Sequence, residues 1–132
     1  QCFADDWKYY SACLYAKNAK PGTGATLELI ARGQAGAAYQ AGSSLSRTGI
    51  PLPQGRSIPL ASDLLLLASL NLPSVFRDFS GVFDSNGDAT FEVDIPNESA
   101  LKGVVFYTSF VTLASNGRLL EISNDAQVEI KG

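Results

Sequence analysis

Acidic side chains are the first residues of this chain whose type and spacing could perform chemistry. Asp5 and Asp6 are adjacent, and Glu92 and Asp94 are two residues apart. Either pair could supply the acid and the base of glycoside hydrolysis. Charges at alternate positions of a strand, however, are typical of a solvated face. The chain also lacks histidine, the commonest general base. We therefore expect no catalytic residues and no enzyme activity.

A second candidate is a calcium loop, because Asp84, Asn86 and Asp88 recur at alternate positions. An EF-hand loop requires glycine at its sixth position and glutamate at its twelfth, where this chain has Ala89 and Ile95. The D-S-N-G segment is therefore interpreted as a hairpin turn, with a calcium site of another kind as the alternative. Neither a P-loop nor a dinucleotide-binding glycine motif occurs. We expect no metal and no cofactor.

The two cysteines, Cys2 and Cys13, lie close to the N-terminus. In one continuous helix their Cα atoms would be about 16 Å apart, at about 1.5 Å per residue. A disulfide needs Cα atoms within roughly 7 Å, so an intrachain bond requires a looped segment. In an exported chain, two cysteines most often form one intrachain disulfide. A bond between subunits and free thiols are the alternatives.

The first 22 residues also concentrate aromatic side chains, including the only tryptophan. The residues that we predict to form an assembly interface share a large apolar or aromatic side chain: Phe3, Trp7, Tyr9, Tyr10, Leu14 and Tyr15. Such a segment could add a strand to a neighbouring subunit or pack on it, because edge strands accept further strands. Trp7 and Tyr9 could instead stack on sugar rings.

The clearest secondary-structure pattern lies in the C-terminal third. Residues 88–95 alternate apolar and polar side chains, which predicts a half-buried strand. Residues 104–113 are apolar or β-branched on both faces, which predicts a central strand covered on both sides. Asn116-Gly117 predicts a hairpin turn with positive φ at both residues. Further strands are expected over residues 118–122 and 126–131.

Shorter strands are expected over residues 25–32, 37–45, 56–60 and 75–83, separated by turn residues. The leucine run within residues 62–70 predicts another strand, with a buried helix as the alternative. About nine short, mostly antiparallel strands at this spacing indicate an all-β fold. We expect a β-sandwich with jelly-roll-like or Greek-key connections. The Pro-Gly-rich turn after residue 20 divides an N-terminal extension, residues 1–22, from the sandwich domain, residues 23–132.

From residue 26 onward, the order of landmarks resembles a family of exported and cell-surface β-sandwich domains of planctomycete-type bacteria. The matching segments are residues 27–33, residues 58–63, FDSNGDATFEVDIPNESALKGVVFYTSF and LEISNDAQVEI. The first 22 residues lie outside this resemblance. It implies a sandwich fold and an exported location, and it brings no catalytic residues.

Composition narrows the remaining classes. The chain has 132 residues, 45% of them hydrophobic and 17% charged, which indicates one globular domain. The net charge of −3 and the lack of a basic cluster argue against nucleic acid as a partner. No apolar run approaches the length of a membrane span. A chain that begins with Gln1 and lacks methionine is expected to be a mature secreted product, extracellular or at the cell surface.

These features predict an exported structural subunit that assembles with copies of itself into an extracellular filament or surface layer. The N-terminal segment would provide the contact, by strand addition or by packing on a neighbour. The alternative is an extracellular carbohydrate-binding or adhesive module, whose partner would be a cell-surface polysaccharide.

Overall fold

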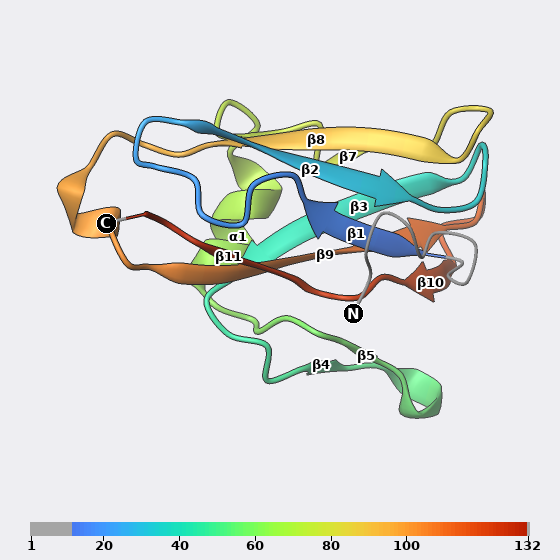
Figure 1. Ribbon diagram of the computed structural model, residues 1–132. Coiled ribbons are helices and arrows are strands. Elements are labelled where there is room, and N and C mark those ends of the chain that lie inside the picture. Colours follow the sequence, from blue (N-terminus) through green and yellow to red (C-terminus); the bar gives the residue numbers. More distant parts are fainter. Residues whose placement is uncertain (1–11, 132) are drawn as a thin grey trace.

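Two antiparallel β-sheets pack face to face in the computed structural model, which describes residues 12–131 (Figure 1). The first sheet has the order β1–β2–β8–β6, and the second has the order β10–β9–β3–β7 with β11 also paired to β9. The strands are β1 (Cys13–Ala16), β2 (Thr26–Arg32), β3 (Ala38–Ser44), β4 (Ile50–Pro51), β5 (Ser57–Ile58), β6 (Phe76–Arg77), β7 (Ser80–Val82), β8 (Asp88–Asp94), β9 (Val105–Leu113), β10 (Leu119–Ile122) and β11 (Ala126–Glu129). Helical turns are α1 (Leu64–Asn71), η2 (Pro53–Gly55) and η3 (Ser99–Leu101). The described chain is an all-β sandwich, as predicted.

The strand order follows that of an immunoglobulin-type sandwich. In the first sheet β1, β2, β8 and β6 take the order A-B-E-D, and in the second β3, β9 and the β10–β11 pair take the order C-F-G. The chain passes between the sheets after β2, β3, β6, β7 and β8, which gives Greek-key connections. A fold shared by so many unrelated proteins carries no function by itself.

Alternating apolar residues build the core from both inner faces. Along β2, Leu27, Leu29 and Ala31 are buried, and Phe91 and Val93 of β8 lie beside them in the same layer. Burying a large apolar side chain stabilises the fold by about 1.5–3 kcal/mol. The alternation predicted for β8 and the central position predicted for β9 are confirmed, whereas the outer face of β9 is only half-buried apart from Ser109.

An aromatic cluster fills the centre of this core. The ring of Tyr39 lies 5.1 Å from that of Phe83 and 5.7 Å from that of Phe91, measured between centroids. The Tyr39 hydroxyl donates a hydrogen bond to the carbonyl of Asp78 at 2.7 Å. Burial raises the pKa of Tyr39, and the nearby Asp78 carboxylate raises it further. The hydroxyl is therefore held as a neutral donor.

The strand predicted over residues 75–83 is two strands in different sheets. β6 pairs with β8 in the first sheet, and β7 pairs with β3 in the second. The break lies at Asp78, whose φ of 61° is left-handed and ends the extended conformation. The D-S-N-G turn connects β7 to β8. Because these two strands lie in different sheets, the turn does not form a hairpin.

Two further details differ from the prediction. Residues 56–60 contain only the two-residue strand β5, which pairs with β4 in a hairpin that extends from the sandwich (Figure 1). The turn at Asn116-Gly117 does connect β9 to β10, but only Gly117 has a positive φ, at 84°. A type I′ turn would need positive φ at both residues.

Candidate assembly interface

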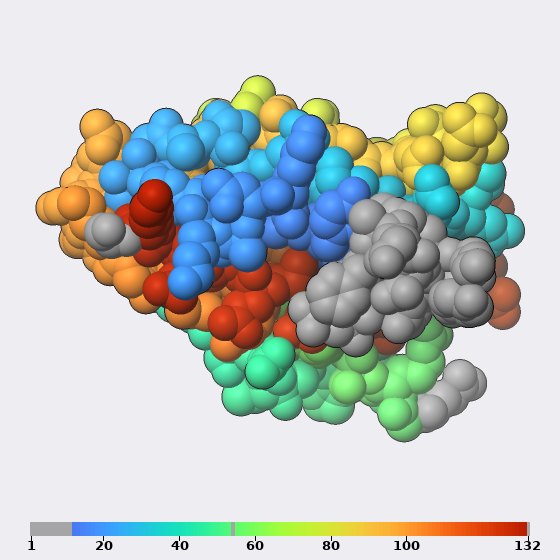
Figure 2. Space-filling view, viewed as in Figure 1, coloured from blue at the N-terminus to red at the C-terminus, as the bar shows by residue number. Residues whose placement is uncertain are grey.

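The described part of the N-terminal segment, residues 12–22, is built into the sandwich. β1 pairs antiparallel with β2 along its whole length. The chain then reaches the second sheet, where the carbonyl of Ala19 accepts from the Glu129 amide at 3.0 Å. The Pro21 carbonyl likewise accepts from the Lys131 amide at 2.8 Å. Figure 2 shows this blue segment lying beside the dark red C-terminal residues. The division expected after residue 22 therefore falls inside one packed unit.

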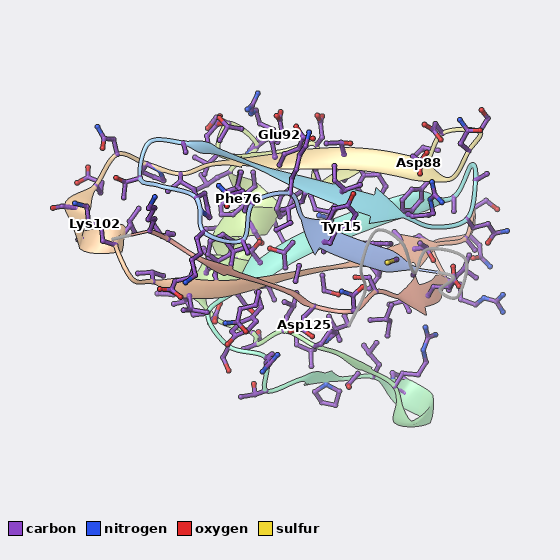
Figure 3. The ribbon with its side chains drawn as sticks, in the orientation of Figure 1. Tyr15, Phe76, Asp88, Glu92, Lys102 and Asp125 are labelled. Carbon is purple, nitrogen blue, oxygen red and sulfur yellow. The ribbon has the colours of Figure 1, made fainter. Side chains whose placement is uncertain are left out.

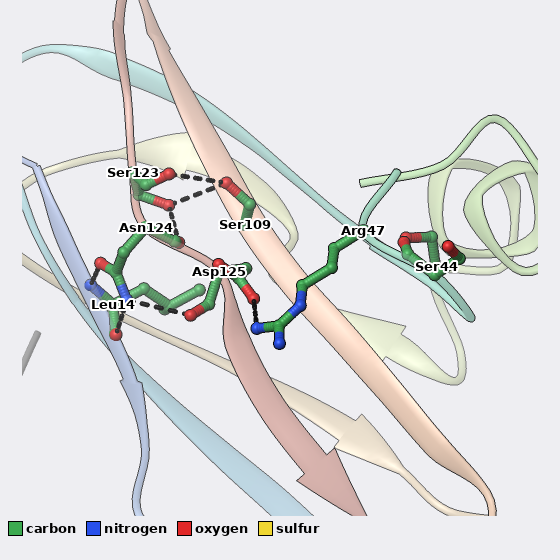
Figure 4. Close-up of polar contacts among 8 residues, drawn as sticks. Leu14, Ser44, Arg47, Ser109, Ser123, Asn124 and Asp125 are labelled. Carbon is green, nitrogen blue, oxygen red and sulfur yellow. Dashed lines mark hydrogen bonds and ion pairs between the residues drawn. The ribbon is translucent and has the colours of Figure 1, made fainter. Parts of the chain in front are cut away.

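The side chain of Asn124 completes the open edge of β1 (Figure 4). Its Oδ1 accepts the amide N–H of Leu14 at 2.9 Å, and its Nδ2 donates to the carbonyl of Leu14 at 2.8 Å. This pair of bonds reproduces what a neighbouring strand offers to an edge residue. The backbone N–H and C=O of Leu14 are therefore already hydrogen-bonded and are not free to pair with a strand of another chain.

The predicted interface residues fall into two groups. Leu14 is fully buried in its own core and Tyr15 is half-buried. Cys13, which is predicted for the disulfide and not for the interface, is also fully buried. Leu14 therefore stabilises its own chain, contrary to a role on an exposed surface. The other predicted residues lie outside the described residues: Cys2, Phe3, Trp7, Tyr9 and Tyr10. The Cys2–Cys13 disulfide and the aromatic contact remain predictions.

The carboxylates of Glu92 and Asp94 both meet one arginine on the outer face of the first sheet. Nη2 of Arg77 lies 3.3 Å from Glu92 Oε1 and 2.8 Å from Asp94 Oδ1. The labels in Figure 3 place Glu92 on this face. Half-exposed ion pairs of this kind contribute about 0–1 kcal/mol each. The pair cross-links β6 to β8. Asp5 and Asp6 lie outside the described residues.

The turn predicted at the D-S-N-G segment is confirmed. Oδ1 of Asp84 accepts the amide of Asn86 at 2.8 Å and that of Asp88 at 2.9 Å. The carboxylate of Asp88 pairs with Nε of Arg32 at 2.9 Å. Within residues 12–131 no group of three metal-ligating side chains occurs.

The leucine run forms α1 in place of the predicted strand. Asp63 precedes the helix in an extended conformation, and its Oδ1 accepts the amide of Leu66 at 3.0 Å, as a helix N-cap does. Its Oδ2 accepts the amide of Leu45 at 2.9 Å, which ties the start of the helix to the end of β3. Leucine is also a strong helix former. These local preferences decide the helical conformation.

α1 packs on the outer face and edge of β3 at Gly42. A Cβ atom on Gly42 would lie only 2.7 Å from Cδ1 of Leu66, so the helix approaches as closely as glycine permits. Beside it, Oγ of Ser69 accepts the amide of Ser43 at 3.0 Å and donates to the carbonyl of Leu66 at 2.8 Å. The helix is therefore fixed to the sandwich by packing and by hydrogen bonds.

An apolar groove of about 520 Å³ lies between α1 and the end of the sandwich. All the residues that line it carry apolar side chains. The helix contributes Leu64, Leu65 and Leu72 to one wall, counting the residue that follows its last turn. The opposite wall is built by residues that follow β8, precede β9 and follow β11: Ile95, Pro96, Leu101, Val104 and Ile130.

Several leucines around this groove are exposed to solvent. Leu45 is 53% exposed, Leu64 83% and Leu72 47%, and all three line the groove. Leu67 and Leu70 continue the exposed surface along α1. A helix that is apolar on every face is normally buried, and exposed apolar patches mark interaction sites. We call Leu45, Leu64 and Leu72 the groove leucines. The sequence analysis did not identify the groove leucines. The available signal was the run Leu64–Leu67, which places leucines on every side of a helix, so that some of them must be exposed unless a partner covers them.

The groove and the start of β1 lie at opposite ends of the sandwich. The first residue of β1 pairs with Arg32, which pairs in turn with Asp88. The groove begins beyond the other ends of the same strands, at Ile95 and Leu101. β2 has seven residues, so these ends are about 20 Å apart at about 3.3 Å per residue. Asp88 and Lys102, labelled in Figure 3, mark the two ends.

Comparison with known proteins shows a weak structural likeness. No family model and no curated protein matches the sequence. Among solved structures, a DUF4466 family protein from Parabacteroides merdae is similar with a TM-score of 0.42 and 16% sequence identity. The match covers 89% of this chain and 44% of that protein, so this chain spans less than half of its length. A likeness at this score carries no argument about function, and the fold described above stands on its strand pairing. Within residues 12–131, no helix has the length and apolarity to cross a bilayer.

Proposed function

We propose that this chain is an extracellular structural subunit that assembles with copies of itself. The observation that carries the proposal is the apolar groove with its three exposed groove leucines at one end of a rigid sandwich. An apolar groove of this size, rimmed by solvent-exposed leucines, fits a protein partner that brings apolar side chains. The predicted disulfide supports an extracellular location.

The free energy available from burying the groove leucines alone is too small for a stable complex. Full burial of a large apolar side chain contributes about 1.5–3 kcal/mol, and the three groove leucines are 47–83% exposed, so their remaining exposed surface offers about 3–5 kcal/mol. Association costs about 4–15 kcal/mol of translational and rotational freedom. A stable contact therefore needs apolar side chains from the partner as well. A contact between opposite ends of successive copies would be heterologous, and it would generate an open filament where the rotation between copies does not close into a ring.

The carbohydrate-binding alternative needs an exposed aromatic platform. Across residues 12–131, every aromatic side chain is buried or half-buried. Tyr107 is half-buried on the outer face of the second sheet, where the Arg47 guanidinium lies 5.1 Å from its ring centroid. The described surface thus supports a protein partner better than a sugar. The alternative rests on Trp7 and Tyr9.

Sedimentation velocity over a wide concentration range tests the proposal. We expect the wild-type chain to self-associate and the double variant Leu64→Glu/Leu72→Lys to associate at least tenfold more weakly. Both positions are exposed, and the new charges suit the two ends of α1, an acid at its start and a base at its end. Val82→Glu is the matched control, because Val82 is 63% exposed but lies outside the groove. A wild-type chain that stays monomeric to millimolar concentration would refute self-assembly.

A further inference from the structure

We infer that the apolar groove is the acceptor for the N-terminal aromatic segment of a second copy, with Trp7 and Tyr10 among the side chains that enter it. This inference rests on the proposed function and names the partner of the same site. It follows from the chemistry of the groove and from the positions of the groove and of the start of β1 at opposite ends of the sandwich.

The chemistry of the segment matches the groove. Residues 3–10 carry Phe3, Trp7, Tyr9 and Tyr10, which are large amphipathic or apolar side chains. Aromatic side chains of this kind dominate the buried centres of protein interfaces. The groove presents apolar atoms throughout and leaves three leucines in solvent. Burial of aromatic rings there would cover the surface that the isolated chain leaves exposed.

The place where the segment joins the sandwich favours another copy over its own chain. The segment precedes β1, whose first residue lies at one end of the sandwich. Its own groove lies at the other end, about 20 Å along the strands and about 10 Å across two strand spacings. A copy stacked end to end presents its groove at the end where the segment begins.

Complementation between two defective chains tests this inference, and Trp7 reports the result because it is the only tryptophan. The first chain, Leu64→Glu/Leu72→Lys, keeps the segment and lacks the acceptor. The second, Trp7→Ser/Tyr10→Ser, keeps the acceptor, lacks the segment's anchors and contains no tryptophan. We expect each chain to be monomeric alone and the mixture to form only a 1:1 heterodimer. The tryptophan emission of the first chain should shift to shorter wavelength and saturate at equimolar second chain.

Controls separate the possible failures. A second chain that also carries Leu64→Glu/Leu72→Lys should produce no shift, and far-UV circular dichroism should match wild type for every variant. If Trp7→Ser/Tyr10→Ser self-associates as strongly as wild type while the groove variant does not, grooves pair with each other and the inference is overturned. If the wild-type emission is already shifted at all concentrations and only the groove variant reverses it, the segment occupies its own groove. That result also overturns the inference. Absence of any wild-type association refutes the proposed function itself.

Discussion

Two hydrogen bonds join the side chain of Asn124 to the backbone of Leu14 in β1, and we call this pair of bonds the clasp. Its removal gives the sharpest prediction on the free energy of unfolding. Asn124→Ala removes the acceptor for the Leu14 amide at 2.9 Å and the donor to the Leu14 carbonyl at 2.8 Å. Each such hydrogen bond contributes about 1 kcal/mol net, so the variant should lose about 2 kcal/mol of unfolding free energy. For a domain of this size, about 1 kcal/mol corresponds to about 4 °C in Tm. The expected fall in Tm is therefore about 8 °C.

Two assays separate the clasp from general damage to the core. Chemical denaturation gives the change in unfolding free energy, and amide hydrogen exchange reports on Leu14 directly. In Asn124→Ala the Leu14 amide should exchange faster, whereas amides of β9 should exchange only as the global stability dictates. The isosteric variant Asn124→Asp keeps the acceptor but sets a carboxylate oxygen against the Leu14 carbonyl. The loss of unfolding free energy in Asn124→Asp, relative to wild type, should become smaller as pH is lowered through about 4, because the protonated carboxyl is again a hydrogen-bond donor.

A null result would be informative. If Asn124→Ala unfolds within about 0.5 kcal/mol of wild type, and Leu14 exchanges at the wild-type rate, then the clasp does not hold β1. The edge of β1 would in that case be open to other chains, and strand addition at β1 would have to be reconsidered as the mode of assembly.

Two further predictions concern the body of the sandwich. Gly42→Ala should destabilise by about 1–3 kcal/mol in urea unfolding, because its Cβ would lie 2.7 Å from Leu66; Gly22→Ala, with no atom within 4 Å, is the control and should be near neutral. Tyr39→Phe should cost about 1 kcal/mol at neutral pH through loss of the bond to the Asp78 carbonyl. Since the pKa of Tyr39 is raised in the folded state, its contribution is complete below the unfolded value of about 10 and is lost as pH rises above it. The steep alkaline loss of stability should therefore be smaller in Tyr39→Phe, and an unchanged alkaline profile would contradict this assignment.

Strands with strict alternation could be predicted from the sequence because one local pattern decides them. β8 buries Phe91 and Val93, and β11 buries Ala126 and Val128, as their period of two requires. Alternate residues of a strand lie on one face of the sheet whichever strands are its neighbours. The all-β class followed from several elements of this kind.

Elements that depend on distant residues could not be predicted in this way. α1 is an exception, because its signals are local: the leucine run lacks alternation, as a buried strand also does, and only the Asp63 cap distinguishes the helix. The separation of β6 from β7 depends on the left-handed conformation at Asp78. The groove combines a helix with three loops far apart in the chain, so no local pattern contains it. The clasp joins Asn124 to Leu14 for the same reason.

The clasp also has a consequence for biosynthesis. Leu14 and Asn124 are separated by 110 positions, so a chain that emerges from the ribosome N-terminus first carries an unprotected early strand for most of its synthesis. Non-local pairings of this kind slow folding and leave nascent chains vulnerable to mispairing. Premature termination before residue 124 would yield polypeptides in which the edge of β1 has no Asn124 to bond the Leu14 backbone, so this edge would stay open to other strands. We expect a cell that makes this protein to depend on chaperones or prompt proteolysis to remove them.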